Sequence, residues 1–218
     1  MYLVEIGAIE EKGPAGSYFI TLEKLEARGS TNSKITDQMF SPWSSLKTPG
    51  AAVAVVRNGE IILKKGYGSA NLEYDLPVAQ STIFNVASLS KQFTAFSILL
   101  LEKNGKLNID DDIRSYLPEV PDFGKKITLR HLLTHTSGLR DESGLLGMSG
   151  LRMDDIITRD YLLTLISHQK EINFTPGDMY EYCNTGYFLL AEAVARVSGQ
   201  SFAEFTLKNI FEPLKMEH

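Results

Sequence analysis

Cysteine is almost absent from this chain of 218 residues. Cys183 is its one cysteine, which excludes an intrachain disulfide framework and a zinc site built from several cysteines. Long apolar runs are missing as well. The longest lies within the segment FSILLLE at residues 96–102 and is far too short to cross a bilayer. We therefore expect no membrane span.

An excess of positive charge is also absent. The net charge is −5 and the basic residues are scattered along the chain, so the sequence offers no phosphate-binding stripe and predicts no nucleic-acid partner. The first residues, MYLVEIGAIEEKG, have no basic start and carry Glu5, Glu10 and Glu11 where the apolar core of an export signal would run. This N-terminus predicts no signal peptide and leaves the localisation open.

The strongest local signal is a hairpin within an otherwise ordinary globular composition, 43% hydrophobic and 22% charged. The segment AAVAVVRNGEIILKKGYG at residues 51–68 holds two β-rich runs joined by Asn58-Gly59, a pair that suits a two-residue type I′ turn. Two strands make a marginal sheet, so further strands are needed. The runs YLVEI and YFITLEKLEA, both before residue 28, form a second candidate hairpin that could supply them.

Helical spacing dominates the rest of the chain. A loose pattern covers residues 35–46, and a stronger one covers Ser88–Asn104, where apolar residues at positions 93, 96, 99 and 100 predict a buried helix. Further helices are predicted near residues 110–117, 128–135, 155–168, 185–198 and 201–211. The fold class we expect is therefore α/β plus all-α, an antiparallel sheet with helices and a mainly helical region.

The pattern Ser-x-x-Lys can form a catalytic dyad, because residues three apart share one face of a helix. It occurs three times, at Ser44/Lys47, Ser88/Lys91 and Ser167/Lys170. Only Ser88 lies at the start of a predicted helix, where free backbone N–H groups and the positive dipole end favour an oxyanion. The other two pairs lie near helix ends and are expected to face solvent.

Lys91 would hold its amine beside the Ser88 hydroxyl. Burial among Phe84, Phe93 and Phe96 would lower the lysine pKa and allow it to take the serine proton. The alternative is structural, with Ser88 as a helix cap and Lys91 as a surface lysine.

A second candidate cluster is the segment GDMYEYCNTGY, which contains Tyr182 and Asn184. A phenol has a pKa of about 10 and can act as a base only if cations lower that value, which a nearby lysine would do. Asn184 would add an amide that orients the lysine or a substrate carbonyl. The structural alternative makes Tyr182 a core aromatic residue and Asn184 the cap of the next helix.

With these two motifs in hand, the chain resembles the serine β-lactamase and penicillin-binding-protein superfamily, in particular its class C branch with esterase and peptidase relatives. The resemblance runs through roughly residues 34–218. Beyond SLSK and YCN it rests on TPGAAVAVVRNGEIILKKGYGSANLE, TIFNVASLSKQFTA, GKLNIDDDIRSYLPEVP, ITLRHLLTHTSGL, FTPGDMYEYCNTGYFLLAEAVARVSGQSF and IFEPLKM.

The resemblance implies a β-lactamase/transpeptidase-like fold and a serine acyl hydrolase of the esterase, peptidase or β-lactamase type. Ser88 would be acylated, Lys91 and Tyr182 would transfer protons, and Asn184 would bind substrate. The Ser88 amide would supply half of an oxyanion hole. A small-molecule or peptide acyl compound is the implied substrate, and neither a metal nor an organic cofactor is implied.

The sequence departs from the family pattern in its third motif, Lys-Thr-Gly or a His-x-Gly variant on a later strand. Nothing after Asn184 matches it, and KKG at residues 64–66 precedes Ser88, the wrong order. We therefore expect a truncated domain without the C-terminal strands. It would comprise an unassigned extension (1–33), the first part of the α/β region (34–86) and a mainly helical region (87–218). Cys183 stands where serine is more usual, a tolerated change.

Two other readings compete with the hydrolase. HLLTH places His131 and His135 four apart, as in a zinc site, yet it lacks the glutamate of His-Glu-x-x-His and an evident third ligand. The resemblance instead makes THTSGL a helix end, with Gly138 permitting the turn and a hydroxyl of Thr136 or Ser137 satisfying backbone groups. The other alternative is a catalytically inactive fragment or fold relative that binds acyl compounds or a partner chain.

Overall fold

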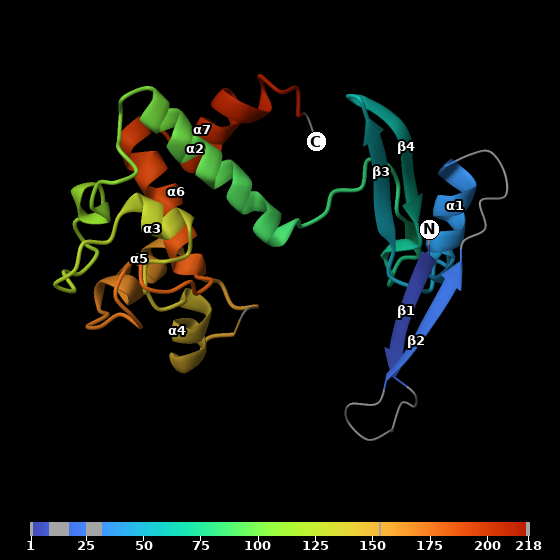
Figure 1. Ribbon diagram of the computed structural model, residues 1–218, viewed down its shortest axis with the longest axis horizontal. Coiled ribbons are helices and arrows are strands. Elements are labelled where there is room, and N and C mark those ends of the chain that lie inside the picture. Colours follow the sequence, from blue (N-terminus) through green and yellow to red (C-terminus); the bar gives the residue numbers. More distant parts are fainter. Residues whose placement is uncertain (1, 9–17, 25–31, 153, 217–218) are drawn as a thin grey trace. The chain divides into compact units, whose positions relative to one another are not determined.

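The computed structural model describes residues 2–8, 18–24, 32–152 and 154–216. The chain divides into two compact units, Met1–Phe84 and Asn85–His218, which Figure 1 shows in blue to green and in green to red. The first unit holds the strands and the second holds most of the helices.

The central element of the first unit is the hairpin of β3 (Ala51–Arg57) and β4 (Glu60–Tyr67). The two strands pair antiparallel, and Arg57 opposite Glu60 closes the ladder. Asn58 and Gly59 have φ of 52° and 81°, the two positive values that a type I′ turn requires. The hairpin predicted from the sequence is confirmed, together with its turn.

The N-terminal runs also form a hairpin, in which β1 (Tyr2–Ala8) pairs antiparallel with β2 (Tyr18–Lys24). The alternative in which these runs supply further strands to the β3–β4 sheet is wrong, because β1 and β2 form a two-stranded sheet of their own. A third small sheet joins β5 (Ser69–Asn71) to β6 (Leu76–Pro77). Each sheet among the described residues therefore has two strands.

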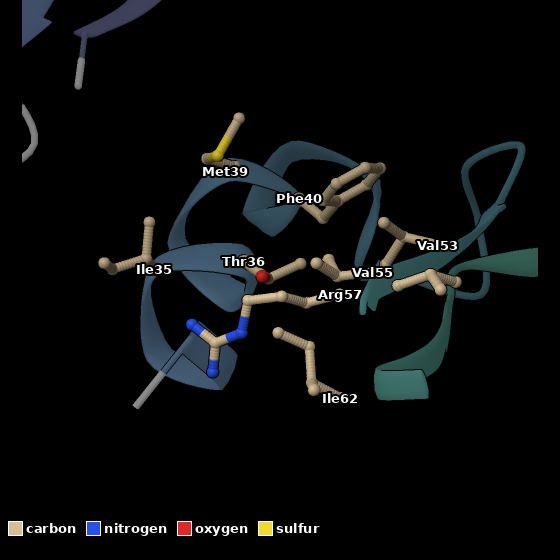
Figure 2. A pocket seen from close by; sticks show the side chains of 9 residues that line it. Ile35, Thr36, Met39, Phe40, Val53, Val55, Arg57 and Ile62 are labelled. Atoms are coloured by element: carbon tan, nitrogen blue, oxygen red, sulfur yellow. The ribbon is translucent and has the colours of Figure 1, made fainter. Parts of the chain in front are cut away.

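Helix α1 (Asn32–Met39) packs beside the β3–β4 hairpin. It ends before the predicted limit of residue 46, and Pro42 lies in the separate 3-10 turn η1 (Ser41–Trp43), consistent with the helix-breaking effect of proline. The Tyr67 hydroxyl donates to Asp37 Oδ1 at 2.7 Å, and the Phe40 ring stacks on Tyr67. Between α1 and the hairpin lies an apolar hollow of about 480 Å³, shown in Figure 2.

The core of the second unit forms where α2 (Lys91–Lys103) and α3 (Leu129–Leu133) pack against α6 (Asn184–Ser198). Its fully buried members are aliphatic side chains contributed by several elements, among them Ile98, Ile113, Leu117, Leu129, Leu132, Leu189, Leu190 and Val194. The core fixes α2 relative to α6, the two helices whose starts carry the candidate site.

Helix α2 buries a different face from the one predicted. Its buried residues are Thr94, Ser97, Ile98 and Leu101, whereas Phe96 and Leu99 are nearly half exposed. The Ser97 hydroxyl donates to the Phe93 carbonyl oxygen at 2.7 Å, so this small residue is satisfied without a partner on another helix. The spacing identified the helix correctly but not its buried side, because apolar residues occur around its whole circumference.

The remaining elements of this unit are short. The stretch predicted near residues 110–117 forms only a 3-10 turn, η3 (Ile113–Ser115). The stretch near 155–168 contains α5 (Arg159–Ser167), and the stretch near 201–211 contains α7 (Phe202–Thr206) followed by the π-helical turn η4 (Leu207–Phe211). Helix α4 (Glu142–Met148) was not predicted. Within the described part of the chain, every helix is too short or too polar to span a membrane.

Candidate active site

Ser88 lies in the 3-10 turn η2 (Ala87–Ser90), which leads directly into α2. The turn begins at a strained residue, since Ala87 has a φ of 44°, an uncommon value for a residue with a side chain. The Asn85 side chain holds this turn by accepting the Ala87 N–H at 2.9 Å. As a result Ser88 is exposed, and its own N–H belongs to the first turn of a helix, as the sequence predicted.

Four residues predicted from the sequence meet at this point. Ser88 Oγ lies 2.5 Å from Tyr182 OH. Lys91 Nζ donates to Ser88 Oγ at 3.1 Å and to Asn184 Oδ1 at 2.8 Å. Residues separated by more than 90 positions thus form one hydrogen-bonded cluster, built from the starts of α2 and α6.

The charge of Lys91 shapes this cluster. Its ammonium lies 4.9 Å from the centre of the Tyr182 ring and 5.5 Å from that of Tyr187. The pKa of Tyr182 is lowered, first by Lys91 and second by the hydrogen bond with Ser88.

The expectation that phenylalanines bury the lysine is not met, because Phe96 is 47% exposed and Phe93 packs edge-on against Phe211. The aromatic neighbours of Lys91 are tyrosines.

Both structural alternatives for the tyrosine motif are wrong. Tyr182 is 44% exposed rather than buried in the core. Asn184 is the first residue of α6, and the preceding N-cap is Cys183, which makes no side-chain capping bond. The Asn184 side chain is therefore available for Lys91, and its backbone N–H finds another acceptor.

That acceptor is Asp141, a residue that the sequence analysis missed. Its Oδ2 accepts the Asn184 N–H at 2.5 Å, while its Oδ1 accepts the Ser143 N–H at 3.0 Å and caps α4. One carboxylate thus joins the starts of two helices. Aspartate is a preferred N-cap residue, and this preference is the signal that could have identified Asp141 as the cap of α4. Its contact with Asn184 has no signal in the sequence.

The segment after α3 bends as the resemblance implied. Gly138 has a φ of 72°, and a Cβ at this position would lie 2.1 Å from the Phe174 carbonyl oxygen, so the turn requires glycine. Ser137 Oγ accepts the Leu139 N–H at 3.3 Å. The Thr136 hydroxyl instead interacts with the Thr134 hydroxyl, so Ser137 is the residue that satisfies a backbone group.

The histidines of HLLTH each serve a backbone amide. His131 Nδ1 accepts the Thr128 N–H at 3.3 Å, and His135 Nδ1 accepts the Cys183 N–H at 3.1 Å. No group of three or more His, Cys, Asp or Glu side chains that could hold a metal occurs among the described residues. These contacts give both rings a role in holding the fold, so the zinc reading finds no third ligand in the described chain.

The other two Ser-x-x-Lys pairs lie outside this cluster, near helix ends as predicted. Ser44 Oγ donates to the Ser41 carbonyl oxygen at 2.7 Å, and Lys47 pairs with Asp75. Ser167 Oγ donates to the Thr164 carbonyl oxygen at 2.8 Å, and Lys170 is exposed.

Cys183 is buried beneath the site. Its thiol donates to the Leu139 carbonyl oxygen at 3.3 Å, and burial raises its pKa. A buried thiol in its protonated form is unreactive, which is consistent with a packing role for this residue.

Comparison with known proteins identifies one family. The model of the beta-lactamase family matches residues 25–218. A penicillin-binding protein of Bacillus subtilis strain 168 is 36% identical over 164 residues, or 75% of this chain and 36% of that protein. A D-aminopeptidase of Gluconobacter oxydans strain 621H is 33% identical over 170 residues, or 78% of this chain and 32% of that protein.

Solved structures agree with the sequence relatives. An octameric penicillin-binding protein homologue from Pyrococcus abyssi matches with a TM-score of 0.70 and 32% identity, over 85% of this chain and 42% of that one. The chain spans about a third of the length of the two curated relatives described above.

Proposed function

This chain belongs to the beta-lactamase family and has part of the β-lactamase/transpeptidase-like fold; on that premise we propose that its second unit carries the acylating machinery of a serine acyl hydrolase. Ser88 is the nucleophile, Lys91 and Tyr182 transfer its proton, and Asn184 orients the lysine and the substrate. One observation carries the proposal, the placement of Ser88 Oγ at 2.5 Å from Tyr182 OH and 3.1 Å from Lys91 Nζ.

Tyr182 is the base in this scheme. Its oxygen is within hydrogen-bond reach of the proton that must leave Ser88, and the Lys91 ammonium stabilises its phenolate form. Asn184 Oδ1 accepts one Lys91 N–H and so holds the ammonium close to Ser88 Oγ and to the Tyr182 ring. The four residues divide the work of nucleophile, base, electrostatic partner and orienting amide.

The acylation step follows from this arrangement. Ser88 Oγ attacks the carbonyl carbon of an ester or amide, its proton passes to the Tyr182 oxygen, and the carbonyl electron pair moves to the carbonyl oxygen. When the tetrahedral intermediate collapses, the leaving group takes that proton and departs, which leaves the acyl group on Ser88. Water then attacks the acyl carbon, gives one proton to Tyr182 and releases the acid, and the proton returns to Ser88 Oγ.

The substrate we propose is a small ester or a short peptide-like amide. The exposed Ser88 hydroxyl favours a compound that can reach the surface of this unit. The D-aminopeptidase among the relatives is consistent with amide cleavage. We propose ester or amide hydrolysis for this chain rather than a specific role in antibiotic resistance, and the D-aminopeptidase is the relative that supports this choice.

A second candidate function is a family member that binds acyl compounds or a partner chain without turnover. The regular elements that the structure describes after Asn184 are helical, and none of them presents a strand with a second oxyanion donor. The Ser88 N–H is the one donor that we assign. Loss of one such donor typically costs about 10²- to 10³-fold in kcat, which slows acylation without abolishing it.

Covalent labelling tests the proposal without a choice of substrate. The intact mass of the chain is measured after incubation with a fluorophosphonate, alongside Ser88→Ala and the matched controls Ser44→Ala and Ser167→Ala. We expect one adduct on the unmodified chain and on both controls, and none on Ser88→Ala. Labelling of all four proteins would overturn the assignment of Ser88, and labelling of none would favour binding without turnover.

A further inference from the structure

We infer that His135 is a positioning residue that fixes Tyr182 in its contact with Ser88; this inference deepens the proposed function and rests on it. His135 does not bond to Ser88 or Lys91. It contacts the segment that carries Tyr182 through its backbone, its ring nitrogen and its ring face.

The backbone and the ring nitrogen of His135 hold both sides of Tyr182. The His135 carbonyl oxygen accepts the Glu181 N–H at 2.9 Å, and His135 Nδ1 accepts the Cys183 N–H at 3.1 Å. These two amides flank Tyr182 in the sequence. One residue therefore fixes the backbone immediately before and after the phenol.

The ring face of His135 adds a third contact. Its centre lies 4.5 Å from that of the Tyr182 ring and 5.1 Å from that of Tyr187. The Tyr187 hydroxyl donates to the Leu133 carbonyl oxygen at 3.0 Å, which ties this aromatic stack to the end of α3. Tyr182 is nearly half exposed, so few other contacts restrict its ring.

His135 reaches this position through an unusual backbone conformation. Its φ is 57°, in the left-handed region that histidine and asparagine adopt more readily than most residues with a side chain. Strained conformations of this kind persist when surrounding contacts over-determine them and often occur near functional sites. Here those contacts are the two hydrogen bonds that His135 accepts from the backbone amides of Glu181 and Cys183.

The neutral form of His135 is the one that can accept the Cys183 amide. Burial lowers the pKa of His135, and the positive charge of Lys91 lowers it further, while Asp141 opposes this effect. The other groups that face the ring are the aromatic side chains of Tyr180, Tyr182 and Tyr187. As the pH falls through the pKa of His135, the ring gains a proton at Nδ1 and the contact with Cys183 is lost.

Two substitutions distinguish the role of His135 Nδ1 as a hydrogen-bond acceptor from the contact of its ring with Tyr182. His135→Asn keeps an acceptor oxygen close to the position of Nδ1 and tolerates the left-handed conformation, whereas His135→Leu removes the acceptor. His168→Leu is the matched control, because His168 is an exposed histidine at the end of α5.

Hydrogen exchange of two backbone amides gives a readout that does not require activity. In His135→Leu the Cys183 amide should exchange about fivefold faster, since a hydrogen bond contributes on the order of 1 kcal/mol and about 1.4 kcal/mol corresponds to a factor of ten. The Glu181 amide should change little, because its acceptor is the backbone oxygen that every variant retains. His135→Asn and His168→Leu should protect both amides. Faster exchange of both amides in His135→Leu would overturn the inference, since His135 would then support the whole segment rather than position Tyr182.

The titration of Tyr182 gives the second readout. It is measured from tyrosinate absorbance as the difference between each protein and its Tyr182→Phe counterpart. His135→Leu should raise the pKa of Tyr182, because the phenol would move away from Lys91. The fluorophosphonate labelling rate at pH 7 should then fall by about tenfold or more, because less Tyr182 is present as phenolate. His135→Asn should restore both. An unchanged Cys183 exchange rate and an unchanged Tyr182 titration in His135→Leu would overturn the inference, whereas an unlabelled wild-type chain would count against the proposed function alone.

Discussion

Replacement of Asp141 by alanine is expected to loosen the starts of two helices at once. Loss of the cap on α4, the bond from the Ser143 N–H, should cost about 0.5–2 kcal/mol. Loss of the bond from the Asn184 N–H, which is made to a charged group, should cost about 1.5–3 kcal/mol. One effect acts in the opposite direction. The pKa of Glu142 is raised by burial and then by the charge of Asp141, so the substitution relieves some repulsion.

The free energy of unfolding should therefore fall by about 2–4 kcal/mol in Asp141→Ala. Asp141→Asn is the informative partner. Asparagine caps helices as well as aspartate does, but its one acceptor oxygen can replace only one of the two carboxylate oxygens. Its cost should be about 1–2 kcal/mol, roughly half that of the alanine variant.

Urea unfolding monitored by two probes can test this prediction. Far-UV circular dichroism reports mainly on the helices, most of which belong to the second unit, while fluorescence of the single tryptophan, Trp43, reports on the first. The dichroism midpoint should fall by about 1 M or more in Asp141→Ala, at a typical denaturant slope of 1–3 kcal/mol per molar urea. A fall in the free energy of unfolding of less than about 0.5 kcal/mol, the usual range for a surface substitution, would refute the reasoning.

Three further results are expected. Lys91→Met should slow fluorophosphonate labelling at pH 7 by about 10²- to 10⁴-fold; a rate close to wild type would contradict the role of the lysine. The labelling rate of the wild type should rise as the pH rises through the lowered pKa of Tyr182, because the phenolate is the active base. This rise should vanish in Tyr182→Phe, and a rise that persists in this variant would identify another base. Gly138→Ala should lower the melting temperature much more than Gly124→Ala: both glycines have a φ near 70°, but only at Gly138 would the new Cβ collide with the Phe174 carbonyl oxygen. Equal losses of stability would show that backbone strain alone decides.

Local signals in the sequence predicted much of the fold. Asn58-Gly59 fixed both the position and the turn type of the β3–β4 hairpin, because few residue pairs accept two positive φ values. Helix α4 was missed because Gly144 and Gly147 lower its intrinsic helix propensity, although Asp141 supplies a good cap.

Packing decided what local patterns could not. Helix α2 carries apolar residues on all of its faces, so its contact with α6 decides which face is buried, and the spacing of these residues does not. The sheet of β1 and β2 shows the same limit, since the strand pattern predicted their hairpin but not whether it joins the β3–β4 sheet.

The candidate site shows the same division. Ser88 and Lys91 were recognisable because their spacing and their place at a helix start carry chemical meaning. The contribution of Asp141 depends on a hydrogen bond across 43 positions, and that of His135 depends on one across 48 positions. Neither has a local pattern that separates it from an ordinary cap or helix end, so these contacts become visible only in the folded chain.

The most direct test of the central claim is to trap the acyl group on Ser88. The chain is mixed with an activated ester such as p-nitrophenyl acetate, quenched in acid within the first turnover, digested and examined by mass spectrometry. The account predicts one acetyl group on the peptide that contains residues 87–96 and none on the same peptide from Ser88→Ala. An acetyl group that persists in that variant, or that lies on another residue of the wild type, would contradict it.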